Sequence, residues 1–317
     1  MSAYTRTPAP IKPNNQQHEI AVGLLEDHAY ISPKYFYDGL GSTLFEAICQ
    51  LPEYYLTRTE SQIFQRHLHD LAHIITPGCT LIDLGAGNCA KAARLFSYLH
   101  PRQYVPVDIS VDHLTEAAQR LLQRFPHIEM TPLGMDFSEQ LTLPDWVRNE
   151  RRIFFYPGSS IGNFQPDQAL TFLRQVRAEC DPEGGLLIGV DLIKDTSVLN
   201  AAYDDDLGVT ASFNLNALRH VNQLLGTDFD LRQWSHVAHF NREKSRIEML
   251  LEAKEDLTVA WESSHRQFLR GERIHTENSY KYDLPSFLGL LAEAGFGALE
   301  HWTDESEWFA VVYAKAA

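Results

Sequence analysis

Short apolar runs alternate with amphipathic stretches through the middle of the chain. The stretches between the runs have helical length, and this alternation predicts a parallel sheet with helices on both faces. The expected strands are residues 80–84, 104–109, 128–133, 153–156 and 186–192. Residues 90–98 and 114–125 repeat apolar side chains at helical spacing, so we expect amphipathic helices there.

The last part of the chain predicts elements that complete this sheet, namely a helix that stops at Gly295 and two strands after it. These three elements are expected at residues 285–294, 298–302 and 308–314. From residue 195 on, a long region rich in Asn, Asp and His interrupts the alternation, and strand-like runs return only at 246–251 and 261–268. The pattern therefore predicts an α/β fold with a Rossmann-like core and an inserted second α/β lobe.

The chain is long enough for two lobes that share a cleft, since 317 residues exceed the usual size of one core. We assign residues 56–194 and 281–317 to the core, which we expect to bind the cofactor. Residues 17–55 and 195–280 form the expected substrate-binding lobe. Residues 1–16, rich in Pro, Asn and Gln, are expected to be a mobile tail.

Composition and charge exclude several classes of protein. No stretch has the roughly 18 uninterrupted apolar residues of a membrane span, and the N-terminus lacks the apolar segment of a signal peptide. A formal net charge of -15 opposes binding to nucleic acid. Four widely spaced cysteines and 14 histidines show no ligand spacing, so we expect free thiols and no metal. The sequence predicts a soluble, cytoplasmic protein, which we expect to be a monomer acting on a small molecule.

The most informative local feature is a strand that carries Asp83 and enters the glycine turn Gly85-Ala86-Gly87. The glycines let the backbone approach a ligand closely, and Asp108, at the end of the next strand, is placed to hold a ribose diol. This pattern is typical of adenosine binding. With Ala90 it also satisfies the glycine motif of nicotinamide-dinucleotide enzymes, and a simple tight turn is a further alternative.

The surrounding residues favour S-adenosylmethionine over a dinucleotide. Asp83 resembles the acid by which class I methyltransferases anchor the methionine part of that cofactor, whereas a pyrophosphate beside it would be repelled. Asp136 and Phe137 follow the third strand, where such enzymes meet adenine, although Asp136 is equally suited to cap a helix. Lys91 is expected to reach the cofactor carboxylate, and a solvated helix lysine is its alternative.

Several longer motifs resemble the bacterial histidine Nα-methyltransferases of ergothioneine biosynthesis, which form trimethylhistidine (hercynine). The matching stretches are Phe36-Tyr37-Asp38, residues 51–55 (LPEYY), 57–60 (TRTE), 158–163 (GSSIGN), 191–195 (DLIKD), 202–205 (AYDD), 208–211 (GVTA), 246–249 (RIEM) and 276–279 (TENS). The resemblance as a whole covers nearly everything from about residue 35 onwards. The family fold is a Rossmann-like methyltransferase core with an inserted substrate lobe, which agrees with the independent partition above.

The resemblance implies a role for individual substrate-site residues. It assigns Asn163 and Tyr203 to the substrate carboxylate, and Glu277 and Ser279 to the imidazole. Such groups suit a zwitterionic amino acid, because amide and phenol donors bind a carboxylate, and a carboxylate accepts a ring N–H. The remaining substrate-site residues of the prediction are Tyr37, Tyr54, Gly158 and Met249.

The implied reaction is an in-line methyl transfer from a sulfonium to the α-amine, in which catalysis rests on positioning. Tyr37 and Gly158 are the expected neighbours of the amine, and Tyr37 or a water is the candidate proton acceptor. After Ser279 the chain departs from the family pattern at Tyr280 and Tyr282, so the shape of the pocket stays open here. The alternatives are a related amine methyltransferase acting on tryptophan or a histidine derivative and, more distantly, a nicotinamide-dependent oxidoreductase.

Overall fold

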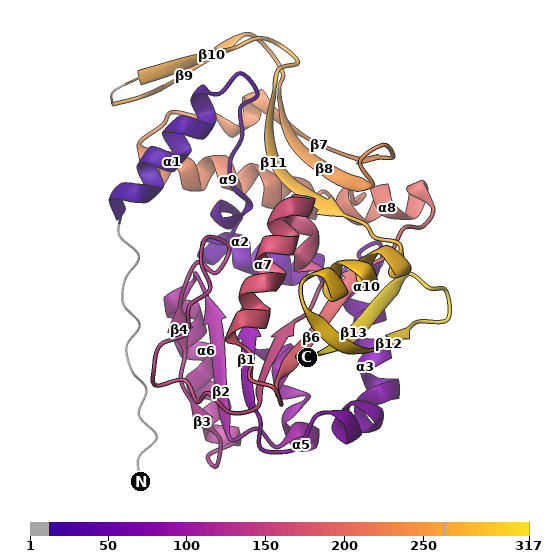
Figure 1. Cartoon of the computed structure of the whole chain (residues 1–317). Helices are drawn as coiled ribbons and strands as arrows, with labels where there is room; N and C mark the ends of the chain where they lie inside the picture. The colour runs from indigo at the N-terminus through magenta and orange to yellow at the C-terminus, as the bar shows by residue number, and fades with distance from the viewer. Residues whose placement is uncertain (1–12, 263, 317) are drawn as a thin grey trace. The chain divides into compact units, whose positions relative to one another are not determined.

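The computed structural model describes residues 13–262 and 264–316 (Figure 1). The chain forms two compact units. The described residues of the first unit are 56–193 and 281–316, and those of the second are 13–55, 194–262 and 264–280. None of the described helices is both long enough and apolar enough to cross a membrane.

The first unit is built on one mixed sheet with the strand order β12-β13-β6-β5-β1-β2-β3, and β4 also pairs with β2. Strands β1, β2, β5 and β6 run parallel, while β13 is antiparallel to both of its neighbours. The bounds are β1 Thr80–Leu84, β2 Gln103–Asp108, β3 Glu129–Met130, β4 Leu133–Gly134, β5 Arg152–Tyr156, β6 Gly185–Asp191, β12 Phe296–Thr303 and β13 Phe309–Ala316. The predicted Rossmann-like α/β fold is therefore confirmed.

Helices cover this sheet and bury a continuous apolar core against it. They are α3 Tyr55–Ile74, α4 Ala90–Ala93, α5 Phe96–Leu99, α6 Val111–Arg124, α7 Pro166–Glu179, α10 Leu284–Glu293 and the short 3-10 helix η2 Ser160–Asn163. Helices α7 and α10 pack together beside the sheet, where Phe172 and Phe287 are buried (Figure 1). Helix α10 ends before Gly295, as predicted, and the positive φ of +93° explains the glycine.

Two predicted elements of the first unit are interrupted. The helix expected over 90–98 is split into α4 and α5, because Arg94 and Leu95 donate to carbonyls only three residues back and tighten the turn. The strand expected over 128–133 is reduced to β3 and β4. Pro132 lies between them and has no N–H to offer a neighbouring strand.

The second unit combines helices with a three-stranded antiparallel sheet, in the order β11-β8-β7, and a separate hairpin of β9 and β10. The elements are α1 Pro13–Leu25, η1 Pro33–Phe36, α2 Gly39–Ile48, α8 Thr196–Tyr203, α9 Val209–Leu225, η3 Leu231–Gln233, β7 Trp234–Asn241, β8 Arg246–Ala253, β9 Leu257–Trp261, β10 Ser264–Phe268 and β11 Arg273–Tyr280. Its core packs Trp234 and Leu251 of the sheet against Leu218 and Val221 of α9.

Two elements of the second unit differ from the predicted pattern. The single strand-like run over 261–268 is wrong, because β9 ends at Trp261 and the chain turns back into β10, which pairs with it antiparallel. Helix α1 begins at Pro13, within the segment 1–16 expected to be a tail, and proline is tolerated in the first turn of a helix. Residues 1–12 of that segment lie outside the described residues.

Candidate active site

The glycine turn after β1 is joined directly to the end of β2. Gly85 and Gly87 have positive φ values of +69° and +50°, which favour glycine. The carboxylate of Asp108 accepts from the Gly87 amide at 3.0 Å and from the Ser110 amide at 2.9 Å. Each carboxylate oxygen has a second lone pair. Asp108 can therefore brace the turn and still accept from a ribose hydroxyl.

Asp83 lies within β1, where it is 2% exposed. Burial raises the pKa of its carboxyl from the ordinary 3.8 to about 7, although the Tyr104 hydroxyl, which donates to it at 2.7 Å, and the Lys91 charge oppose the shift. A cation bound beside this buried carboxyl would favour its ionised form. The ammonium group of a methionine moiety would supply one.

Phe137 lies beside the glycine turn, since a Cβ added to Gly85 would meet its ring at 3.9 Å. The ring also packs against Tyr156 and Phe172, with centroids 5.8 and 5.9 Å away. Asp136 accepts from the amide of Ser138 at 3.1 Å. It caps a turn and not a helix, since no helix begins there. The helix-cap alternative for Asp136 is therefore wrong, and an apolar ring next to an acid fits an adenine site.

Lys91, Gly158 and Glu60 meet in the first unit. One carboxylate oxygen of Glu60 lies 2.7 Å from the Lys91 ammonium, and the other accepts from the Gly158 amide at 2.7 Å. The alternative of a fully solvated Lys91 is wrong, since its side chain is paired and 38% exposed. Sequence analysis assigned Glu60 no role, although the motif 57–60 ends at this residue.

The turn 158–163 has a defined and unusual backbone. Gly158 and Ser159 have φ values of +80° and +65°, and the Ser159 hydroxyl accepts from the Asp191 amide at 2.8 Å. Asn163 closes this turn as the last residue of η2 and is half-buried. Of the predicted substrate residues, Gly158 and Asn163 thus belong to the first unit.

The other six predicted substrate residues belong to the second unit, where five of them are buried close together. Glu277 faces Met249 across the β11–β8 pair, and the hydroxyls of Ser279 and Tyr203 lie 2.8 Å apart. The ring of Tyr54 lies 6.1 Å from that of Tyr203. Burial raises the pKa of Tyr54 well above its ordinary value, and Tyr203 adds to the shift. Tyr54 is therefore a neutral hydrogen-bonding group at physiological pH.

Tyr37 stands in an aromatic cluster of the second unit. Its ring packs against Phe45 and Phe213, with centroids 5.8 and 5.7 Å away, and Phe45 in turn packs against Tyr54. Tyr37 follows η1 and is half-buried. A half-buried phenol within a ring cluster can offer both an oxygen and a π face to an amine.

His236 contacts the backbone of Tyr203, and sequence analysis did not predict this contact. One ring nitrogen lies 2.9 Å from the Tyr203 carbonyl and the other 2.8 Å from the Asn214 amide nitrogen, which also donates to the Leu250 carbonyl. This pattern fixes a neutral ring with the proton on Nε2. Burial lowers the pKa of His236, so the neutral form is retained.

Tyr280, where the chain departs from the family pattern, lies on the opposite face of β11 from Glu277 and Ser279. Its hydroxyl accepts from Arg246 at 2.7 Å, across the β11–β8 pair. The identity of residue 280 therefore does not shape the face that carries the predicted imidazole readers. Tyr282 belongs to the first unit and packs against Phe287.

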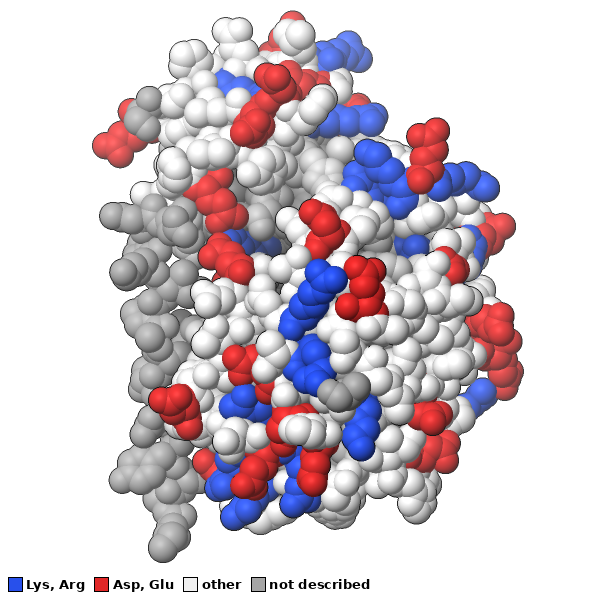
Figure 2. All heavy atoms as spheres, in the orientation of Figure 1, with Lys and Arg blue, Asp and Glu red and all other residues white. Residues whose placement is uncertain are grey.

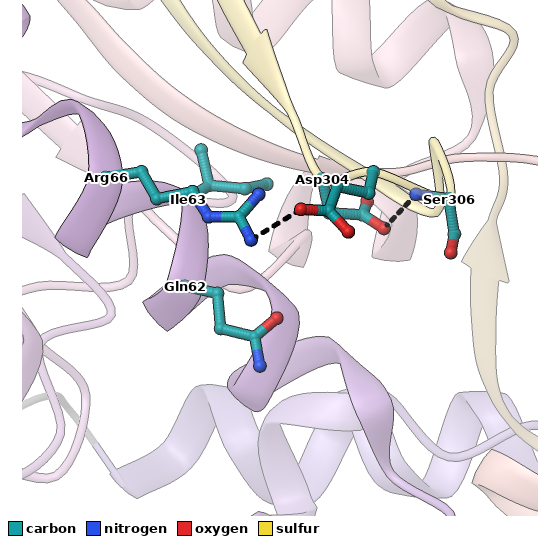
Figure 3. A pocket seen from close by; sticks show the side chains of 6 residues that line it. Gln62, Ile63, Arg66, Asp304 and Ser306 are labelled. Atoms are coloured by element: carbon teal, nitrogen blue, oxygen red, sulfur yellow. Dashed lines mark hydrogen bonds and ion pairs between the residues drawn. The ribbon is translucent and has the colours of Figure 1, made fainter.

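A polar surface hollow in the first unit contains none of the predicted site residues (Figure 3). It lies between α3 and the β12–β13 turn and holds an ion pair of Arg66 with Glu305 at 2.8 Å.

Acidic and basic side chains are interspersed over the face seen in Figure 2. Among the described residues, no cluster of three or more His, Cys, Asp or Glu side chains could hold a metal ion.

Comparison with known proteins identifies the family. A family model described as histidine-specific methyltransferase, S-adenosylmethionine-dependent, matches residues 16–316. The chain is 38% identical over 295 residues to the histidine N-alpha-methyltransferase of Mycolicibacterium smegmatis, covering 91% of each chain. It is 36% identical over 296 residues to that of Mycobacterium tuberculosis, covering 92% of this chain and 91% of the relative.

A relative with a different printed substrate matches as well. The 4-dimethylallyltryptophan N-methyltransferase of Arthroderma benhamiae is 24% identical over 308 residues, covering 90% of this chain and 89% of its own. The family match confirms S-adenosylmethionine as the cofactor, in preference to a nicotinamide dinucleotide. The protein is an S-adenosylmethionine-dependent amino-acid N-methyltransferase, and its chain belongs to the histidine-specific methyltransferase family.

Proposed function

We propose that this protein methylates the α-amine of L-histidine in three successive steps and so produces trimethylhistidine, the hercynine of ergothioneine biosynthesis. The observation that carries the proposal is the buried polar group formed by Glu277, Ser279 and Tyr203 in the second unit. An acid and hydroxyls in one buried cluster suit an imidazole, which offers one N–H donor and one acceptor nitrogen. The mycobacterial relatives, whose printed activity is the same, support it.

S-adenosylmethionine supplies an electrophilic methyl group on a sulfonium. We assign Asp83 and Lys91 to its methionine part, Asp108 to the ribose, and Asp136 with Phe137 to the adenine. Gly85 and Gly87 bring the backbone close to the ligand. All seven residues belong to the first unit.

The α-amine must enter neutral or lose its proton first, so that its nitrogen has a lone pair. This nitrogen then attacks the methyl carbon, the carbon–sulfur bond breaks, and its electron pair stays on sulfur. In the first two rounds the new ammonium loses a proton before it can react again, and we assign that proton to Tyr37 or a water beside it. Asn163 and Tyr203 are assigned to the carboxylate, and Gly158 to the surroundings of the amine. Tyr54 and Met249 complete the assigned lining. These groups act by orienting the lone pair and excluding water.

A mass-spectrometric assay tests the proposal. The purified protein is incubated with S-adenosylmethionine and each free amino acid, and mono-, di- and trimethylated products are followed over time. We expect trimethylhistidine from histidine, and little product from histamine, because histamine lacks the carboxylate assigned to Asn163 and Tyr203. Absence of turnover of histidine, or equal turnover of histamine, would contradict the respective assignment.

A tryptophan derivative is the second candidate substrate, favoured by the Arthroderma benhamiae relative. Glu277 and Met249 are the discriminating positions, because they face each other across the strands. The same assay with tryptophan separates the two candidates.

We also propose a monomeric, cytoplasmic enzyme that binds neither nucleic acid nor membranes. The net charge of -15 supports the absence of nucleic-acid binding, and the mass in solution tests the monomer.

A further inference from the structure

Glu60 is a charged side chain that the roles above leave unexplained. It lies in helix α3 and is 1% exposed. Removing a carboxylate from water costs several kcal/mol in general. Its two oxygens are compensated by the Lys91 ammonium and the Gly158 amide, both at 2.7 Å. A single buried acid thus joins three elements of the first unit.

The backbone of a fourth element leaves room for this carboxylate. Gly189 lies in the middle of β6, and a Cβ there would come within 2.4 Å of a Glu60 oxygen. Gly158 contributes in a similar way, since a Cβ there would stand 3.0 Å from the Lys91 nitrogen. The two glycines therefore let the Glu60 carboxylate, the Lys91 ammonium and the Gly158 turn pack against one another.

The geometry leaves Lys91 able to bind something else. An ammonium has three N–H donors, and the bond to Glu60 uses one. The Lys91 side chain is 38% exposed while that of Glu60 is only 2% exposed. Glu60 is thus the buried partner of a partly exposed lysine, and a ligand carboxylate would approach Lys91 from its exposed side.

We propose that Glu60 is a positioning residue for methyl transfer, which fixes Lys91 for the cofactor carboxylate and the Gly158 turn for the substrate amine. The inference rests on the roles proposed above for Lys91 and Gly158. By holding both groups on one carboxylate, Glu60 sets the methionine part of the cofactor in register with the amine. A purely stabilising role fits less well, because apolar side chains of similar volume usually stabilise a core at least as well as a buried ion pair.

A double-mutant cycle on S-adenosylhomocysteine binding tests the inference. Glu60→Gln, Lys91→Met and the double variant are compared with the unchanged protein by calorimetry. Because Glu60 acts through Lys91, we expect Glu60→Gln to weaken binding roughly tenfold alone and to have little effect in the Lys91→Met background. Glu305→Gln is the matched control, since it removes an ion pair to the same helix α3 at an exposed position and should leave binding unchanged.

Turnover provides a second readout. With saturating cofactor, Glu60→Gln should still lower kcat for histidine, because the Gly158 turn is no longer held, and Glu60→Asp should fall between the two proteins. Equal weakening by Glu60→Gln with and without Lys91, or unchanged binding, overturns the inference. If Glu60→Gln does not fold, Glu60→Asp takes its place in the same cycle. The binding cycle needs no amino acid, so failure to methylate histidine would refute the proposed function and not this one.

Discussion

The hydroxyl groups of Tyr203 and Ser279 share one hydrogen bond at 2.8 Å, although the two residues are 76 positions apart in the sequence. One is proposed to bind the substrate carboxylate and the other the imidazole. Because either hydroxyl can be the donor, the orientation of each depends on the other. Binding of the substrate carboxylate and binding of the imidazole are therefore expected to be coupled through this hydrogen bond.

Substitutions at these two positions should be non-additive. We expect Tyr203→Phe and Ser279→Ala each to lower kcat/KM for histidine, and the double variant to lose about 1 kcal/mol less than the sum, since the shared bond is lost only once. Steady-state kinetics of the four proteins checks this. Thr276→Val is the matched control, because the Thr276 hydroxyl bonds to the Met249 carbonyl instead. Additive losses for Tyr203 and Ser279 would contradict the coupling.

Cofactor affinity should depend on pH through Asp83. Only the ionised carboxylate attracts an ammonium, and burial raises its pKa to about 7. Binding of S-adenosylhomocysteine should therefore weaken as pH falls below about 7, by up to about tenfold per unit. Calorimetry between pH 5.5 and pH 8.5 measures this (about the range in which histidine and Asp83 titrate). In Tyr104→Phe the midpoint should move to higher pH, because the O–H that lowers this pKa is gone.

The same raised pKa affects the stability of the ligand-free protein in the opposite sense. A carboxyl that binds its proton more tightly when folded contributes stability that is present below about pH 4 and lost as pH rises through about 7. Asp83→Asn should remove this part of the dependence of both stability and cofactor affinity on pH. An unchanged profile in Asp83→Asn would show that another group is responsible.

Stability of the first unit should depend on a buried ion pair near the end of β6. Lys281 lies 2.8 Å from Asp191, and both side chains are 0% exposed. Lys281→Met would leave the carboxylate buried without this cation, so we expect a loss of about 3–5 kcal/mol in the free energy of unfolding. Denaturant titration of the two proteins measures it.

The exposed pair of Arg66 and Glu305 offers the comparison. Its side chains are 54% and 80% exposed, and Glu305→Gln should cost at most about 1 kcal/mol. Asp191→Asn combined with Lys281→Met should recover part of the loss, because the uncompensated charge is then gone. A loss in Lys281→Met no larger than that in Glu305→Gln would contradict the assigned importance of burial.

Local patterns allowed the core of the fold to be predicted. The apolar run at 80–84 matches β1 residue for residue, since a buried parallel strand is a continuous apolar segment bounded by a turn. Glu60 shows where this reasoning ends. Its partners lie 31 and 98 positions away, and the docking of helix α3 that brings them together has no signature in the local sequence.

The face of Glu277 shows a second limit. Simple alternation from the buried Ile274 would place Glu277, three residues on, on the other side of β11. The register shifts between His275 and Glu277, so Ile274 faces Leu251 and Glu277 faces Met249, both on one side of β8. A β-bulge of this kind restores the face but leaves little trace in the pattern of apolar and polar residues. Glu277 and Ser279 both follow the bulge, so their position on one face of β11 could be predicted from simple alternation.

Substrate choice should depend on Glu277, which is 8% exposed and faces Met249. If its carboxylate accepts an imidazole N–H, Glu277→Ala should lower kcat/KM for histidine by about 2–4 kcal/mol, because a buried hydrogen bond to a charged group is lost. The pocket also becomes larger and less acidic, so relative activity on tryptophan should rise. Specificity constants for both amino acids measure the change.

Two further measurements separate selectivity from general damage. Glu277→Gln keeps the shape and one acceptor oxygen, so its histidine-to-tryptophan ratio should lie between those of the unchanged protein and Glu277→Ala. Affinity for S-adenosylhomocysteine should stay the same in both variants, because Glu277 is not among the residues assigned to the cofactor. If the ratio does not move while turnover falls for both amino acids, Glu277 does not read the side chain, and the choice of histidine must rest on other residues.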